Sequence, residues 1–86
     1  MESTKAKRYA VLDEFSQGQR ERLLYLEMHL WFSGVIGRRD LETRFGIKPA
    51  AASRDLAAYR ELAPTNLEYD TSDRCYRVAK AFHPVF

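Results

Sequence analysis

The segment RRDLETRFGIKPAAASRDLAAYRELA, from Arg38 to Ala63, predicts two short helices joined by a tight turn. The first helix runs to about Phe45, and Leu41 lies four residues before this phenylalanine, so both side chains share the face toward the core. Gly46 ends the helix, because glycine adopts a positive φ without a Cβ clash. This pattern is typical of a helix-turn-helix.

The second helix of the motif is expected over residues 49–62. Pro49 suits the first helical position, because its missing N–H would have no partner there. Its buried face is predicted by apolar residues at helical spacing, namely Ala52, Leu56 and Tyr59. The small side chain of Ala52 lets the two helices approach closely. Pro64 ends the helix, because proline disfavours an α conformation in the residue before it.

A longer helix is expected earlier in the chain, from Ser16 to Gly34, with Ser16 and Gln19 as a capping box and Gly34 in the left-handed position. One apolar stripe is formed by Leu23, Leu26 and Leu30, and a second by Leu24, Met28 and Trp31. Two stripes predict burial on more than one side. Either the chain's own hairpin and N-terminal arm cover the second stripe, or it contacts another subunit or a further domain.

The chain is expected to divide into an N-terminal arm or short helix over residues 1–15 and one domain over residues 16–86. A short helix over residues 5–14 would place Tyr9 and Leu12 on one side. Such an arm either packs on the next helix or contacts DNA or a second subunit, and the sequence leaves both alternatives open.

A β-hairpin is predicted near the C-terminal end. Polar and apolar residues alternate over residues 66–70 and again over residues 75–78, with a polar four-residue turn between them. Tyr76 and Val78 would share one face of the hairpin and Arg77 the opposite face. Residues 35–37 form an extended link that can add one minor strand. The predicted fold is therefore mainly α with a small β-hairpin, a winged helix-turn-helix.

Charge is distributed unevenly along the chain. The net charge is only +2, but residues 38–60 contain six basic side chains against three acidic ones. Basic charge gathered on one segment is what binding to a phosphate backbone requires. Together with the helix-turn-helix pattern, this indicates binding to double-stranded DNA, with the helix over residues 49–62 in the major groove.

The candidate DNA-binding residues lie on three parts of this fold. Arg38 and Arg39, at the start of the first motif helix, would contact phosphates together with backbone N–H groups. The groove-facing side of the next helix is expected to carry Lys48, Ala50, Ala51, Ser53 and Arg54. Arg54 can pair with guanine O6 and N7, a contact worth about 1–3 kcal/mol of discrimination. In the hairpin, Arg74 and Arg77 can contact phosphate or a minor groove, or they form an exposed surface pair.

Other function classes find little support in the sequence. It contains no paired carboxylates in a plausible cleft, no Cys/His pair, no metal-ligand spacing and no phosphate-binding glycine loop, so we predict no enzymatic activity, no cofactor and no small-molecule substrate. The single cysteine, Cys75, excludes an intrachain disulfide and agrees with a cytoplasmic, nucleoid-associated protein. No apolar run reaches about 18 residues, so no membrane partner is expected.

Several motifs together resemble a known family. They are DL-x-x-RFGI (Asp40 to Ile47), A-SRDL-x-x-YRELAP (Ala52 to Pro64) and NLEYD (Asn66 to Asp70), followed by a tyrosine-containing strand. This combination resembles the N-terminal winged-helix domain of bacterial WYL-domain transcriptional regulators, in particular repressors that control phage-defence operons. The likeness covers about residues 17–86.

The resemblance implies a homodimeric repressor that binds an inverted-repeat, palindromic operator through the helix over residues 49–62. It also implies a following WYL domain and a dimerisation domain, which this chain lacks, so the chain is either an excised domain or a stand-alone relative. The alternative is a winged-helix module for protein interaction or dimerisation without specific DNA binding, because a fold does not fix a function.

Overall fold

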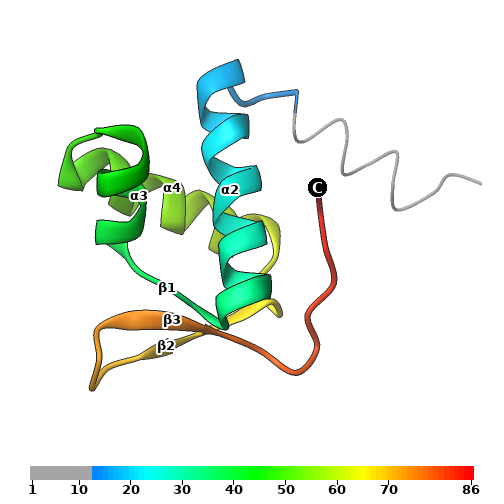
Figure 1. Cartoon of the computed structure of the whole chain (residues 1–86). Coiled ribbons are helices and arrows are strands. Elements are labelled where there is room, and N and C mark those ends of the chain that lie inside the picture. Colours follow the sequence, from blue (N-terminus) through cyan, green and yellow to red (C-terminus); the bar gives the residue numbers. More distant parts are fainter. Residues whose placement is uncertain (1–12) are drawn as a thin grey trace, which may run out of the picture.

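A computed structural model of the chain describes residues 13–86. Three helices and a small antiparallel sheet follow one another along the chain as α2 (Gln17–Ser33), β1 (Val35–Ile36), α3 (Arg38–Phe45), α4 (Pro49–Leu62), β2 (Leu67–Asp70) and β3 (Cys75–Val78), as Figure 1 shows. The predicted winged helix-turn-helix is confirmed. The predicted helix over residues 5–14 lies mostly outside the described residues, and its last two positions, Asp13 and Glu14, lie in a turn.

Helix α2 begins and ends where the sequence predicted. The Oγ of Ser16 accepts a hydrogen bond from the backbone N–H of Gln19 at 3.1 Å, and Gly34 has φ +80°. In the described residues only the serine half of the predicted capping box forms, and the side-chain amide of Gln19 donates to Asp55 at 3.2 Å. The beginning of α2 is therefore joined to α4.

The helix-turn-helix follows from short-range signals. Gly37 precedes α3, and its N–H donates to the carboxylate of Asp40 at 2.7 Å. Gly46 ends α3 with φ +65°, and Pro49 is the first residue of α4. Ala52 is fully buried. A side chain larger than a methyl group would hold the two helices further apart at this position.

The sheet has the strand order β1-β3-β2, with both pairs antiparallel. Val35 pairs with Arg77 and Leu67 with Val78, and residues 71–74 form the turn of the hairpin. The predicted minor strand is confirmed as β1. Because β1 leads directly into α3, its pairing with β3 joins the wing to the helix-turn-helix.

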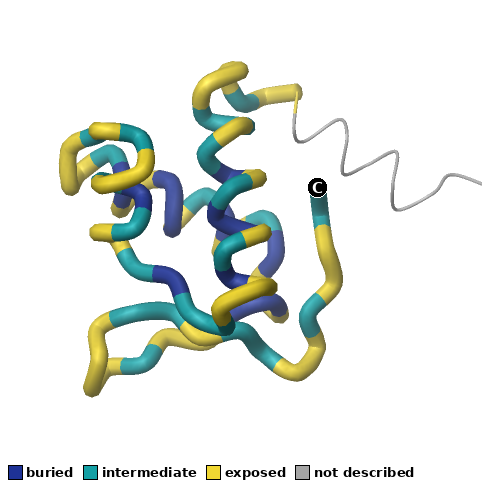
Figure 2. The backbone as a smooth tube through the Cα atoms, viewed as in Figure 1, coloured by how far each residue is buried: buried dark blue, intermediate teal, exposed yellow. Residues whose placement is uncertain are grey.

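The core lies where the three helices and the sheet meet (Figure 2). The first apolar stripe of α2 is fully buried. The other elements add further buried side chains, namely Ile36, Leu41, Leu56, Tyr59 and Leu67. The second stripe is exposed, with relative exposures of 41% for Leu24, 49% for Met28 and 56% for Trp31. Within residues 13–86 the hairpin does not cover this stripe. The ring of Phe82 packs on that of Trp31, with 4.9 Å between the ring centroids, and covers it only in part.

Candidate nucleic-acid interface

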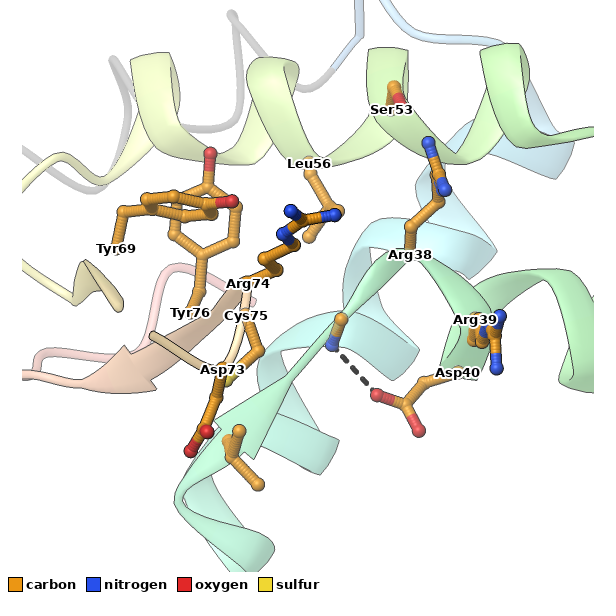
Figure 3. Close-up of a pocket in the computed structure, with 12 residues that line it drawn as sticks. Arg38, Arg39, Asp40, Ser53, Leu56, Tyr69, Asp73, Arg74, Cys75 and Tyr76 are labelled. Carbon is orange, nitrogen blue, oxygen red and sulfur yellow. Dashed lines mark hydrogen bonds between the residues drawn. The ribbon is translucent and has the colours of Figure 1, made fainter. Parts of the chain in front are cut away.

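The beginning of α3, helix α4 and the wing enclose a cavity of about 660 Å³ (Figure 3). Four of the predicted DNA-binding residues line it, namely Arg38, Arg39, Ser53 and Arg74. In Figure 3, Arg38 enters this space from α3 and Arg74 from the wing. The wall on the wing side is formed in part by Tyr69 and Tyr76. The centroids of their rings are 5.0 Å apart. The fold therefore brings cations from separate elements to one concave surface.

Arg38 and Arg39 occupy the first turn of α3, and both are exposed. The Nε of Arg38 lies 3.2 Å from a carboxylate oxygen of Glu42, one turn later in the helix. Arg38 is more than half exposed and makes no hydrogen bond to the buried Oε2 of Glu42, so its guanidinium can turn toward a phosphate, although this leaves that oxygen without its cation. The N–H groups at the start of the helix favour an anion at the same place.

One face of α4 is exposed over its first two turns. The exposed residues there are Lys48, Pro49, Ala50, Ser53 and Arg54, whereas Ala51 is half-buried. The part of the chain that the structure describes places no ion-pair partner on Arg54 or Lys48. Small alanine side chains next to an unpaired arginine leave the helix backbone close to solvent. A helix of this kind can lie deep in a groove and present one long hydrogen-bonding side chain.

Arg77 has a different environment from Arg54. Its Nε donates to Asp70 at 2.7 Å and its Nη2 to Asp73 at 2.5 Å. The hydrogen bond from Arg77 is the main cause that lowers the pKa of Asp70 below its usual value, and Asp70 in turn raises the pKa of Arg77. Arg77 is thus held in an exposed ion pair within the wing, and its contact with DNA stays a prediction.

Arg74 lies at the tip of the wing with φ +53° and is exposed. The turn before it is closed by Asp70, whose Oδ1 accepts the backbone N–H of Ser72 at 2.9 Å and of Asp73 at 3.2 Å. Arg77 holds both carboxylates of the turn through its own hydrogen bonds, so neither of them pairs with Arg74. Among residues 13–86 it has no ion-pair partner.

The buried face of α4 carries a carboxylate, Asp55, that the sequence pattern did not single out. Asp55 is 1% exposed and accepts two hydrogen bonds from Arg22, at 2.5 and 3.3 Å, and one from Gln19. Its spacing from Ala52 and Leu56 already placed Asp55 on the buried face. Asp55 is one of the three acidic residues within segment 38–60, and its charge is compensated by Arg22 of α2.

A second buried carboxylate, Glu27, was missed in the same way. It follows Leu23 and Leu26 and precedes Leu30, so it shares their buried face, and it is 4% exposed. It accepts the hydroxyl hydrogen of Tyr59 at 2.8 Å. Glu27 and Asp55 together attach α4 to α2 by polar contacts as well as by the apolar core.

The match with known proteins covers most of this fold. Residues 18–86 match the winged helix-turn-helix domain of BrxR transcriptional regulators. The chain belongs to this family. It is also similar to proteins named DNA-binding transcriptional repressor CapW, with 48% identity over 69 residues for one from Escherichia coli (strain KTE188). A CapW from Pseudomonas aeruginosa is 44% identical over 69 residues, and one from Stenotrophomonas maltophilia is 41% identical over 68.

These matches cover about four fifths of the chain, 80% for the first two relatives and 79% for the third, but only 23% of each relative. The chain thus spans about a quarter of the length of these curated repressors. Residues 13–86 contain no group of three or more His, Cys, Asp or Glu side chains placed to bind a metal ion. None of the helices in that same range is both long and apolar enough to cross a bilayer.

Proposed function

We propose that the chain is a sequence-specific, double-stranded-DNA-binding domain of a transcriptional regulator, and that it acts in repression. The observation that carries the proposal is the gathering of Arg38, Arg39 and Arg74 around one cavity beside the exposed face of α4. Membership of the BrxR-type domain family and similarity to repressors named CapW support it.

In the proposed complex α4 lies in the major groove. Arg54 pairs with a guanine edge, and Ser53 contacts a base or a phosphate. Arg38 and Arg39 bind phosphates at the start of α3, where the helix dipole also favours an anion. Arg74 reaches the backbone or the minor groove from the wing. Lys48 adds a further cation at the start of α4.

A homodimer on an inverted-repeat operator is part of the same proposal, as is a cytoplasmic, nucleoid-associated role in the control of a phage-defence operon. A twofold protein dimer and a palindromic site have matching symmetry. The exposed stripe of Leu24, Met28 and Trp31 on α2 supports self-association, because an apolar patch of adjacent side chains on a small domain is typical of a contact surface.

The test is selection of bound sequences from a random duplex library, followed by a salt titration on the selected sequence. We expect Arg54→Ala to reduce discrimination at one base pair by about 1–3 kcal/mol. Arg38→Ala should weaken all sequences alike and reduce the slope of log K against log salt by about 0.9. Arg60→Ala is the matched control, since Arg60 is exposed on the last turn of α4 and outside the proposed contact set.

Failure of the chain to bind any duplex at high protein concentration and low salt would refute the proposal. The second candidate, a protein-interaction or dimerisation module without specific DNA binding, is favoured by the exposed stripe of α2 alone. Sedimentation with and without duplex separates the two. A tight dimer or partner complex that does not respond to DNA supports the second candidate.

A further inference from the structure

Three buried polar side chains meet beneath α4 and form what we call the polar hub, defined as Glu27, Tyr59 and Asn66. Each comes from a different part of the chain: Glu27 from α2, Tyr59 from α4 and Asn66 from the residue before β2. Their relative exposures are 4%, 0% and 1%. Polar groups this deeply buried are costly unless their hydrogen-bonding capacity is filled.

Residues 79–86, which follow β3, fill much of that capacity. The backbone N–H groups of Val85 and Phe86 donate to the two carboxylate oxygens of Glu27, at 2.7 and 3.0 Å. Asn66 binds the backbone of His83 on both sides, since its Nδ2 donates to the carbonyl at 2.7 Å and its Oδ1 accepts the N–H at 2.9 Å. In Figure 1 this segment runs alongside α2.

Helix α4 enters the same hub through Tyr59. Its hydroxyl donates to Glu27 at 2.8 Å and accepts from the Nδ2 of Asn66 at 3.0 Å. Burial raises the pKa of the Tyr59 hydroxyl, the bond from Asn66 lowers it, and the bond to Glu27 raises it further, with a net increase. The phenol therefore stays protonated and remains a donor. Of the three donors to Glu27, two belong to residues 79–86 and one belongs to α4.

We propose that residues 79–86 are coupled to DNA binding through the polar hub, so that docking of this segment stabilises the DNA-binding position of α4. When the segment leaves, Glu27 loses two of its three donors and Asn66 loses both contacts with His83. The buried carboxylate must then attract water or another donor, and Tyr59 shifts with it. Any partner or neighbouring segment that displaces residues 79–86 lowers DNA affinity. This inference rests on the proposed DNA-binding function.

A movement at Tyr59 reaches the DNA-facing residues because α4 is one continuous helix. Tyr59 follows Arg54 by five residues, about 7.5 Å along the helix axis at 1.5 Å per residue. Arginine pairs with a guanine edge through two directional hydrogen bonds, so a shift of about 1 Å at this distance is enough to impair the contact.

The ion pair of Arg22 and Asp55 provides a control for this coupling. It also attaches α4 to α2, but residues 79–86 donate no hydrogen bond to either side chain in the described structure. A change in this pair weakens the support of α4 without altering the segment. Its effect on DNA affinity should therefore be the same whether the segment is docked or released.

The test combines one measurement on the unmodified chain with one variant. In the unmodified chain, amide hydrogen exchange of His83, Val85 and Phe86 is followed with and without the selected duplex. Coupling between two binding events is reciprocal. If docking of residues 79–86 strengthens DNA binding about fivefold or more, DNA binding should slow exchange at these amides by the same factor. The variant Val85→Pro/Phe86→Pro lacks both N–H donors to Glu27 and should lose DNA affinity by a similar factor.

Release of the segment in the variant is measured separately by fluorescence. Trp31 is the single tryptophan of the chain, and its ring centroid is 4.9 Å from that of Phe82. Tyr59→Phe should lower DNA affinity in the unmodified chain and much less in the released variant. Arg22→Lys, which keeps the charge, should have equal effects in both backgrounds.

Two results would overturn the coupling while leaving the proposed function intact. One is a folded variant with a changed Trp31 signal and undiminished affinity for the duplex. The other is exchange of the three amides that does not change when DNA binds, a measurement that needs no variant to fold. If the unmodified chain bound no duplex at all, both the function and the coupling would be refuted.

Discussion

Substitution of Arg22 tests whether the buried face of α4 depends on its ion pair with α2. The Nε and Nη2 of Arg22 lie 2.5 and 3.3 Å from the carboxylate of Asp55. The Asp55 side chain is 1% exposed and that of Arg22 23%. In Arg22→Ala the carboxylate retains only the amide of Gln19, at 3.2 Å, as a hydrogen-bond donor.

The expected cost follows from the burial of the two partners. Removing one partner of a fully buried ion pair costs about 3–5 kcal/mol, because the other charge is left uncompensated. Arg22 is partly exposed and the alanine side chain lets water approach Asp55, so we expect the lower value of about 2–3 kcal/mol. In a domain of this size, 1 kcal/mol shifts Tm by about 4–8 °C, so Tm should fall by about 10–20 °C.

The assay is urea unfolding followed by circular dichroism, in which the midpoint should fall while the slope m stays unchanged. Arg20→Ala is the matched control on the same helix, because Arg20 pairs with the exposed Asp13 at 3.4 Å. Its cost should be below about 0.5 kcal/mol. The double variant Arg22→Ala/Asp55→Ala should be more stable than the sum of the two single changes implies. Equal costs for Arg22→Ala and Arg20→Ala would refute the reasoning.

Three further outcomes follow from single positions. Gly46→Ala should cost about 1–2 kcal/mol by thermal unfolding, because φ is +65° while an added Cβ meets nothing within 4 Å, so the strain is in the backbone alone. Ala52→Leu should cost about 1–3 kcal/mol in the same assay by overpacking the helix-turn-helix corner, and a cost near zero would show that the corner can expand. Asp70 has a lowered pKa, so its pair with Arg77 should stabilise the wing at any pH above about 4 and be lost as the pH falls through the lowered value; an NMR titration of the Asp70 carboxyl that gave an ordinary pKa would contradict this.

The boundaries of the helices could be predicted because short-range signals set them. Gly34 and Gly46 have the positive φ that the sequence pattern required, and Pro49 begins α4 as expected. These positions depend on steric properties of one residue and its neighbours, which are the same in any fold. The same holds for the wing, whose alternating residues and polar turn are contiguous in the chain.

The partners of charged residues could not be predicted in the same way. Spacing placed Glu27 and Asp55 on buried faces, but carboxylates are rarely buried, and their partners come from distant parts of the chain. The sequence also does not distinguish Arg77, which forms ion pairs, from Arg54, which forms none in the described residues. The hairpin brings Asp70 and Asp73 within reach of Arg77, whereas no carboxylate of the described residues pairs with Arg54.

The buried carboxylates constrain α4 in a way that its apolar contacts do not. Contacts of Leu56 and Ala52 with the core are non-directional, so they tolerate small rotations of the helix about its axis. The hydrogen bonds of Asp55 and Tyr59 are directional, and these two residues lie one turn apart on the buried face of α4. A binding residue must be positioned to within about 0.5 Å of its productive geometry. The contacts that support it determine whether this precision is reached. Apolar replacements of similar volume often leave stability unchanged or improved. The directional contacts of Asp55 and Tyr59 therefore account better for the orientation of α4 than for the stability of the domain.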